Sequence, residues 1–435
     1  MLRNDKRLIE RAEQVVPGGV YGHMSTYLMP DGVPQYYTKS KGTYLWDADG
    51  NKYFDCLSAY GPNLLGYGNA QVQDAIRNQL EHCDTMSGPS PLMVDLAEAM
   101  VDMIDHANWA MFCKNGTDAT SIATTIARAK TGRSKIVVGR GIYHGCLPWS
   151  TPSMEGVQPA DRMNLIYFDV TDMDSFTDAV RQAGDDLAGV IVTPYRHEVF
   201  GDQHFFPQEM AQLIRKSCDE KEAVLILDEV RTGFRLSVGS AWSEHGVQPD
   251  ISCWGKMLGN GQPISAVLGT DEVKQAASSI YVTGSFWFSA VPMAAAIETL
   301  RQVREGSYFK QIMAYGRRLR AGLEDRARAF GFELSQTGPV TMPQILFRED
   351  PDFRIAYRFC QLLAQNGVLF SPYHNMFMNA GMTDEAIDGV LETSEKVFAE
   401  LKDTRGNIPA IPDRVTEKLN KRKPLLGLGQ KQKLA

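Results

Sequence analysis

The chain has 435 residues, of which 43% are hydrophobic and 22% charged, as is typical of a soluble globular protein with about two to three domains. Its 52 acidic residues outnumber 45 basic ones, giving a net charge of −7, whereas proteins that bind nucleic acid through its phosphates are usually basic. No apolar run approaches bilayer length and the first seven residues lack a signal peptide's apolar core, so we expect a cytoplasmic protein without nucleic-acid or membrane partners.

The first hundred residues combine helices with a hairpin. Helices are predicted over 5–15, 69–82 and 91–104, where the sequence has helical, amphipathic patterns. Between the first two, alternating aromatic residues in 43–55 flank Asp49-Gly50-Asn51, a strong turn signal. This pattern predicts a β-hairpin near the N-terminus.

From about residue 110 to 270, short apolar runs alternate with helical patterns. Such alternation predicts a mostly parallel sheet covered by helices on both faces, and therefore an α/β fold. The strands are expected at Trp109–Cys113, Ile136–Val138, Asn164–Tyr167, Gly189–Val192, Val224–Leu227 and Ala266–Leu268.

The remaining residues predict a smaller α+β region. A long helix at 290–305 leads out of the parallel sheet, and further helices are expected at 308–330, 352–366 and 383–402. Short strands are expected near 332–335, 343–348 and 368–371. The last residues form a basic tail that contains Lys421-Arg422-Lys423-Pro424.

Cysteine usage argues against a cross-linked or metal-binding protein. The seven cysteines, at positions 56, 83, 113, 146, 218, 253 and 360, are odd in number and show no CxxC spacing. We expect neither a disulfide framework nor a metal site, but reduced thiols that serve as small packing residues.

The segment Asn115-Gly116-Thr117-Asp118 follows a predicted strand and begins a helical pattern that continues to Lys130. Free backbone N–H groups at the start of a helix, with the helix dipole behind them, bind anions. Gly116 allows close approach of a phosphate, and Thr117 adds a hydroxyl donor. The same residues also fit an ordinary N-cap with Thr117 or Asp118 as the capping residue.

Asp228 and Lys256 are the most informative residues. Asp228 ends the apolar run 223–227, and Lys256 lies further along the chain in a glycine-rich loop. An acid that pairs with the pyridine nitrogen and a lysine that forms a Schiff base are the two groups required by pyridoxal 5'-phosphate (PLP). Tyr143, in the motif Tyr143-His144-Gly145, is placed to stack on the cofactor ring.

In this chain order, the motifs resemble the class III (ω-type) aminotransferases of PLP fold type I, and most closely glutamate-1-semialdehyde 2,1-aminomutase and its relatives. The resemblance covers about residues 10–400. It is carried by Pro17-Gly18-Gly19-Val20, Tyr44–Gly50, Tyr60-Gly61-Pro62, Asn115–Thr120, Tyr143–Gly145, Leu227–Arg235, Pro249-Asp250 and Gly255-Lys256.

The resemblance implies a homodimer with the active site at the subunit boundary. Asn115, Gly116, Thr117, Tyr143 and His144 then contact PLP together with Asp228 and Lys256, and Ser285 of the partner subunit contacts the phosphate. The implied domains are an N-terminal segment 1–62 that belongs to the small domain, a large PLP-binding domain 63–305, and a C-terminal small domain 306–435 with the basic tail.

The resemblance also implies the activity. We expect an aminotransferase that moves an amino group from an amine or amino acid donor to a keto or aldehyde acceptor by ping-pong half-reactions. Lys256 carries the cofactor and shuttles protons, and Asp228 is the counter-ion of the ring. Two alternatives stay open at this point: an aminomutase, racemase or other PLP isomerase, and a binding protein of this fold without catalysis.

Departures from the family pattern concern the substrate. The arginine that aminomutases carry a few residues beyond Pro-Gly-Gly-Val is replaced by a stretch that includes Tyr21 and His23. A substrate carboxylate is usually met by arginine. Either Arg196 supplies that group, or the substrate has no carboxylate at this place. Further pocket candidates are Trp287 and Tyr373-His374.

Overall fold

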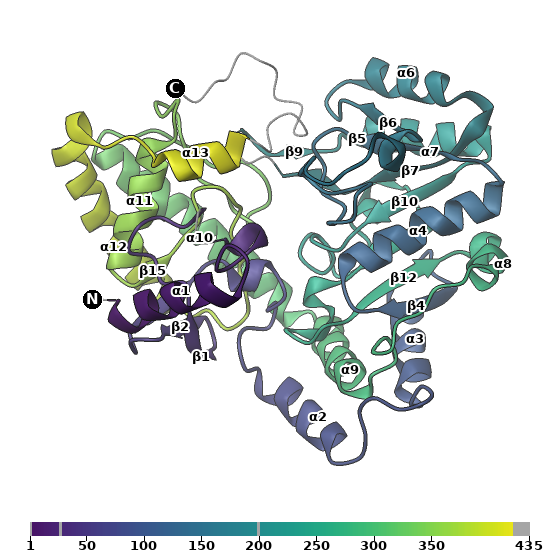
Figure 1. Ribbon diagram of the computed structural model, residues 1–435, viewed down its shortest axis with the longest axis horizontal. Helices are drawn as coiled ribbons and strands as arrows, with labels where there is room; N and C mark the ends of the chain where they lie inside the picture. Colours follow the sequence, from purple (N-terminus) through teal and green to yellow (C-terminus); the bar gives the residue numbers. More distant parts are fainter. Residues whose placement is uncertain (1, 26–27, 198–200, 421–435) are drawn as a thin grey trace.

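The computed structural model describes residues 2–25, 28–197 and 201–420 and shows two lobes. The larger lobe is built on a seven-stranded sheet, drawn in blue and green on the right of Figure 1. In sheet order its strands are β4 (Trp109–Cys113), β12 (Ser265–Gly269), β11 (Ile251–Trp254), β10 (Val224–Asp228), β7 (Leu187–Val192), β5 (Lys135–Gly139) and β6 (Leu165–Phe168).

The sheet is mostly parallel, as predicted. Only β12 runs against both of its neighbours in this sheet, β4 and β11, while the strands from β11 to β6 are parallel. The strand β11 was missed by the sequence analysis because polar Ser252 interrupts its apolar pattern. Ser252 is buried, but its hydroxyl has hydrogen-bonding partners: it lies 2.8 Å from Trp254 Nε1 and 2.9 Å from His106 Nε2.

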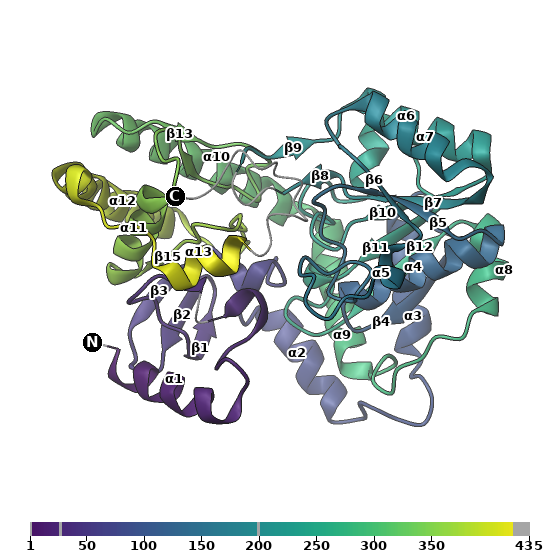
Figure 2. The same ribbon diagram turned by 45° about the horizontal axis from the view of Figure 1, so that its top comes forward.

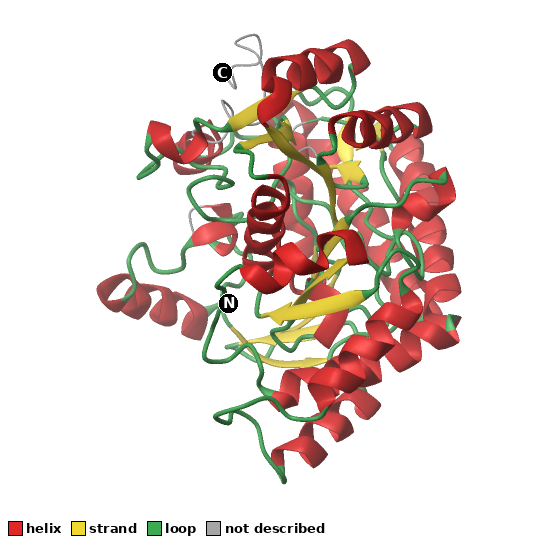
Figure 3. Ribbon diagram, turned by 90° about the vertical axis from the view of Figure 1, so that its right-hand side faces the viewer, coloured by secondary structure: helices red, strands yellow, loops and turns green. Residues whose placement is uncertain are grey.

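Helices cover both faces of this sheet (Figure 3). Alternate residues of a strand face opposite sides, and β10 shows this directly. Val224 and Ile226 join a core with α4 (Gly116–Thr131) and α8 (Asp271–Ser279), whereas Leu225 and Leu227 pack with α6 (Met173–Ala183) and α7 (Gln208–Lys221). The all-apolar strands are therefore explained by burial on both sides.

The smaller lobe joins the two ends of the chain. The helix α1 (Arg3–Val15) lies beside a sheet in which β1 (Tyr37–Lys41), β2 (Tyr44–Asp47) and β3 (Lys52–Asp55) pair with β15 (Val368–Leu369). The predicted hairpin is confirmed. Its turn is fastened by the Asp47 carboxylate, which accepts hydrogen bonds from the backbone of Asp49 and Asn51. The domain limits at residues 62 and 305 stay predictions.

The expected C-terminal helices and short strands are present. The expected helices are α9 (Ala290–Glu305), α10 (Ser307–Ala329), α11 (Arg354–Gln365) and α12 (Asp384–Thr404), and the strands β13 (Leu334–Ser335) and β14 (Leu346–Phe347) form a small pair. The helix α13 (Asp413–Asn420) was not predicted. The other helices are α2 (Ala70–Leu80), α3 (Leu92–Met103) and α5 (Pro159–Arg162). Of the predicted basic tail, which comprises the last thirty residues, the part 421–435 lies outside the described residues.

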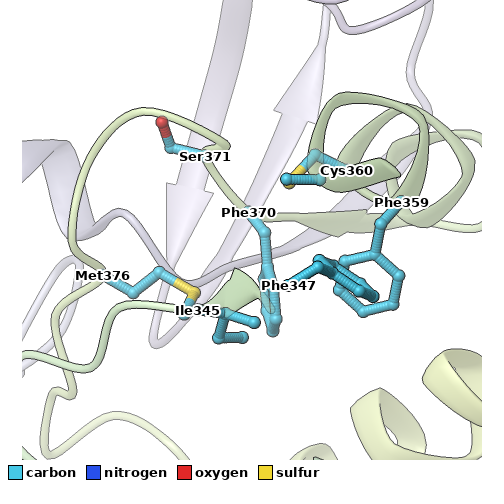
Figure 4. A pocket seen from close by; sticks show the side chains of 8 residues that line it. Ile345, Phe347, Phe359, Cys360, Phe370, Ser371 and Met376 are labelled. Carbon is cyan, nitrogen blue, oxygen red and sulfur yellow. The ribbon is translucent and has the colours of Figure 1, made fainter. Parts of the chain in front are cut away.

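The apolar core of the smaller lobe contains a small cavity. Figure 4 shows Phe347, Phe359 and Phe370 around it, together with Ile345, Cys360, Ser371 and Met376. Its lining is nearly all apolar, so we interpret the cavity as imperfect packing within the core. No helix in the described parts of the chain is long and apolar enough to cross a membrane.

A short hairpin that follows β7 contacts the smaller lobe. The short strands β8 (Tyr195–Arg196) and β9 (His204–Phe205) pair with each other and lie between the lobes in Figure 2. From this hairpin, the Gln203 backbone N–H donates to Thr337 Oγ1 at 2.7 Å. Residues of the C-terminal lobe are thereby held over the carboxyl edge of the large sheet.

Candidate active site

Asp228 and Lys256 are brought to the same edge of the large sheet. The parallel strands β10 and β11 pair Asp228 with Cys253, and Lys256 follows Cys253 by one short loop. The carboxyl edge of a parallel sheet is where ligands bind in such folds. The Asp228 side chain is buried, and its Oδ1 accepts from the Val230 backbone N–H at 3.0 Å.

His144 holds the other oxygen of this acid. Its Nδ1 lies 2.7 Å from Asp228 Oδ2, so the imidazole donates to the carboxylate, and both side chains are almost fully buried. The His144 ring stacks at 6.5 Å on Trp149, whose Nε1 donates to Ser121 Oγ. The carboxylate is thus fixed in one orientation.

Lys256 begins a short 3-10 helix (Lys256–Gly259) with φ +43°, a left-handed conformation that is costly for a residue with a side chain. Burial, reinforced by the positive charge of Arg231, lowers its pKa to about 8, although Asp228 acts in the opposite direction. At pH 7 about one such lysine in ten is uncharged, against roughly one in a few thousand in water. This amine is prepared to act as a nucleophile and a base.

The predicted anion site is formed at the N-terminus of α4. Asn115 is the N-cap and accepts from the Asp118 backbone N–H at 3.0 Å, so the capping residue is Asn115 rather than Thr117 or Asp118. Gly116 packs against Val230, two residues after Asp228. A Cβ atom at position 116 would lie only 2.5 Å from Val230 Cγ1. The absence of a side chain at 116 therefore sets the distance between the helix and the acid.

The loop after β5 meets the same helix end. Thr117 Oγ1 accepts from the Cys146 backbone N–H at 3.2 Å, and Thr120 Oγ1 donates to the His144 carbonyl at 2.6 Å. Tyr143 precedes this junction with a half-exposed side chain. The three predicted segments around residues 116, 144 and 228 thus form one connected group.

Four rings form a wall next to Lys256, which we call the aromatic wall: His23, Tyr60, His197 and His374. Tyr60 contacts His23 and His374 edge-on at 4.5 and 5.2 Å between ring centres, and His197 lies 4.8 Å from His374. Tyr60 belongs to the left-handed turn Ser58–Tyr60. The next residue, Gly61, has φ +116°, which favours glycine, and a Cβ atom at this position would lie 3.1 Å from Lys256 Cδ. A residue with a side chain would therefore be strained here.

Two arginines after β10, Arg231 and Arg235, reach this region, and neither was among the predicted site residues. Arg235 is fully buried and donates to the carbonyls of Met378 and Gly61 at 2.6 and 2.8 Å, so it fastens the small lobe to the site. Arg231 Nη1 donates to Asn375 Oδ1 at 2.7 Å. Its position just beyond a sheet-ending aspartate was the one signal available in the sequence.

The other predicted residues lie farther from this group. Tyr21 is exposed, and Trp287 packs on the core of α4 and α8. Arg196 is buried with Nη1 4.0 Å from Asp169 Oδ1. Ser285 is exposed in the loop that precedes α9. Of the pair at 373–374, His374 joins the aromatic wall, whereas Tyr373 packs with a separate cluster around Leu28.

The donor set fits PLP. A buried acid, an amine of lowered pKa and a helix N-terminus lie along one sheet edge, and they match the ring nitrogen, the aldehyde and the phosphate of that cofactor. A match to the class-III aminotransferase family spans residues 29–398. The chain belongs to this family.

The relatives of this class-III aminotransferase are consistent with that assignment. It is 51% identical over 394 residues to an aminopentol aminotransferase of Sphingopyxis macrogoltabida, a match that covers 91% of this chain and 93% of the relative. It is 32% identical to a 3-aminobutyryl-CoA aminotransferase of Cloacimonas acidaminovorans (strain Evry), over 92% of this chain and 98% of that protein.

Solved structures agree with these matches. The FumI protein of Sphingopyxis sp. MTA144 with PLP superimposes on this class-III aminotransferase with a TM-score of 0.93 and 49% identity, over 94% of this chain and 99% of that one. A glutamate-1-semialdehyde aminomutase of Pseudomonas aeruginosa PAO1 shares the fold with a TM-score of 0.80 at 18% identity, over 92% of this chain and 94% of that one. The chain is a PLP-dependent aminotransferase of fold type I, as the sequence predicted.

Proposed function

We propose that the amino donor is a polar primary amine with hydroxyl groups and without a carboxylate on the amino-bearing carbon. The observation that carries this is the aromatic wall, where a phenol and three imidazoles offer hydrogen-bonding partners. Burial and Arg231 lower the pKa of His197 and His374 well below the usual value, so both imidazoles stay neutral at pH 7. The aminopentol named for the 51% identical relative is an amine of this kind.

The test is a competition between donors. The purified enzyme is given a long-chain amine with several hydroxyl groups, the same chain without hydroxyls, and alanine, each with 2-oxobutyrate in excess, because pyruvate is the product that alanine itself yields. Mass spectrometry of the ketone products should show the hydroxylated amine turned over with the highest kcat/KM. Equal or better use of alanine would contradict the proposed donor.

We propose the following roles for the residues at the sheet edge. When bound, PLP supplies a ring that withdraws electrons from the carbon bearing the amino group. Asp228 supports this by keeping the ring nitrogen protonated, and His144 positions Asp228. Lys256 Nζ, when uncharged, takes the proton from the substrate carbon and later returns a proton.

The remaining cofactor contacts belong to this proposal. The backbone at Gly116, with Asn115 and Thr117, holds the phosphate at the N-terminus of α4, and Tyr143 covers the ring. The hydrogen bond between His144 and Asp228 fixes the carboxylate that would face the ring nitrogen. Preorganised charges of this kind need no rearrangement during the reaction.

We propose that the enzyme works as a homodimer in which Ser285 of the partner subunit completes the phosphate site. Support comes from the segment around Ser285, which exposes large apolar side chains: Tyr281 is 92% exposed, Phe286 65% and Phe288 42%. Exposed apolar patches on a folded protein mark contact surfaces. If this segment forms the contact between two subunits, the Ser285 hydroxyl of each subunit can reach the phosphate site of the other.

We propose a cytoplasmic location. All seven cysteines are free, and five of them are buried: Cys56, Cys113, Cys218, Cys253 and Cys360. Free thiols persist in reducing compartments. Fractionation of the source cells with an antibody to this chain tests the assignment, which recovery from the periplasm or the medium would contradict.

A further inference from the structure

Arg231 carries a positive charge that its surroundings leave unbalanced. The residue is half-buried, and its Nη1 donates to a neutral amide oxygen, Asn375 Oδ1, at 2.7 Å. Within residues 2–25, 28–197 and 201–420, none of the ion pairs closer than 4.0 Å involves Arg231. A charge withdrawn from water without a counter-ion is unfavourable unless a ligand supplies one.

The neighbouring carboxylates are engaged elsewhere. Asp228 is held by His144 and by the Val230 backbone. Glu229 is fully buried and points into the following turn, where Oε2 accepts from Thr232 Oγ1 at 2.6 Å and Oε1 from the Ala241 backbone at 2.7 Å. Neither acid is therefore available to neutralise Arg231.

The groups packed around Arg231 hold it in place without changing its charge. Asn375 donates its backbone N–H to His197 Nε2 at 3.1 Å and accepts from His374 Nδ1 at 2.7 Å. His197 Nε2 accepts this hydrogen bond and therefore carries no proton. The Nδ1–H of His374 donates to the Asn375 carbonyl. Both rings are neutral, so an anion next to Arg231 would meet one fixed cation beside two hydrogen-bonding rings.

Arg231 and the reacting lysine meet the same aromatic wall: Arg231 contacts Asn375, whose carbonyl accepts from His374, and Lys256 lies against Gly61, next to Tyr60, which contacts His374. In a 2-keto acid the carboxylate is bonded directly to the carbonyl carbon that receives the amino group. A cation that holds this carboxylate must therefore lie beside the amine that handles that carbon. Among the arginines of the site, Arg235 is committed to two carbonyls, which leaves Arg231 for this role.

We propose that Arg231 binds the carboxylate of the amino acceptor, a 2-keto acid, and so determines acceptor specificity. This inference rests on the proposed function, in which the donor brings no carboxylate to the same pocket. The exchange balances without an oxidant: the donor amine becomes a carbonyl, the acceptor carbonyl becomes an amine, and the water used in one half-reaction is released in the other.

The experiment compares pyruvate with methyl pyruvate, which has the same ketone but no charge. With a hydroxylated amine as donor, Arg231→Gln should lower kcat/KM for pyruvate by about 10- to 100-fold and change that for methyl pyruvate only a few-fold. Arg231→Lys should retain part of the preference, because it keeps the charge but loses the bidentate fork. Arg304→Gln, which removes a surface arginine paired with Asp102, serves as the matched control.

A second readout uses the protein without turnover. The pH midpoint for PLP uptake by the apoprotein reports the charge of Lys256, so it should move upward in Arg231→Gln and stay near the wild-type value in Arg231→Lys. If Arg231→Gln does not fold, the selective loss of pyruvate use by Arg231→Lys still decides the question.

The possible failures are distinguishable. If Arg231→Gln keeps the preference for pyruvate, or if its kcat/KM falls equally for pyruvate and methyl pyruvate, Arg231 does not bind the carboxylate of the acceptor. If Arg196→Gln abolishes the preference instead, that arginine is the anchor and the inference is wrong. If the wild-type enzyme prefers alanine to the hydroxylated amine, the proposed donor fails, while the acceptor comparison repeated with 2-aminobutyrate as donor, whose keto product differs from pyruvate, still tests Arg231.

Discussion

Burial and two arginines act together on Lys256. Burial and Arg231 lower its pKa most strongly, Arg235 adds to this, and Asp228 opposes it, with a net value of about 8. The uncharged amine is the form that attacks the cofactor aldehyde. The rate of PLP uptake by the apoprotein should therefore rise with pH around a midpoint near 8, which stopped-flow absorbance measures. A midpoint near that of free lysine would contradict the described environment.

The same shift has a consequence for stability, with a definite sign. The folded-state pKa lies below the unfolded value of 10.5, so between the two pH values the unfolded chain binds more protons than the folded one. Lys256 therefore contributes a free energy of unfolding that increases from about pH 8 to 10.5 and is lost as the pH falls. Denaturation of wild-type apoprotein and Lys256→Met across this window isolates the contribution.

Asp228 should matter for chemistry far more than for folding. Asp228→Asn keeps the size of the side chain and leaves an oxygen that can accept from His144, but it removes the negative charge. We expect kcat to fall by roughly 100- to 1,000-fold, the range seen when one preorganised electrostatic group is lost. Absorbance should still show bound PLP, and the thermal midpoint should stay close to wild type. A variant with normal kcat would rule out the counter-ion role.

At the scale of elements, the spacing between α4 and β10 depends on one missing side chain. A methyl group on Gly116 would meet Val230 Cγ1 at 2.5 Å, and a branched side chain cannot move aside freely. Gly116→Ala should lower the free energy of unfolding by about 1–3 kcal/mol and weaken PLP binding, because the helix end shifts from Asp228.

The matched control is a glycine in open space. Gly389 lies on the exposed side of α12, and no atom lies within 4 Å of the place that an alanine methyl group would take. Gly389→Ala should therefore stabilise the protein by about 0.5–1 kcal/mol. Urea denaturation of both variants, with PLP titration of each, measures the contrast. Opposite signs are expected, and equal effects would show that the contact with Val230 is unimportant.

The elements themselves were largely predictable. Strands buried on both faces read as apolar runs, so the ends of the six predicted strands were found within one or two residues, whereas β11 was missed. Asp228 and Lys256 were paired because they are the two groups that PLP requires, and the parallel strands β10 and β11 bring them to one edge. The contact between Arg231 and Asn375 could not be derived in this way. Arg231 and Asn375 are 144 residues apart and meet only because the small lobe packs over the sheet edge. No periodicity within one segment reports such a contact.

At the scale of the whole molecule, the exposed segment 281–288 leads to a test of the dimer. If Ser285 of the partner subunit serves each phosphate site, Lys256→Ala and Ser285→Asp damage different parts of the same composite site. Each variant alone should be nearly inactive, the first for lack of the amine and the second because its carboxylate repels the phosphate.

Mixing the two variants should restore activity. A hybrid dimer contains one site that combines the intact Lys256 of one subunit with the intact Ser285 of its partner. Random exchange makes about half of the dimers hybrid, so about a quarter of the wild-type activity is expected. Refolding the two chains together and assaying across mixing ratios measures this, with each variant refolded alone as the control. If Ser285 served the site of its own chain, no hybrid would contain an intact site and mixing would restore nothing.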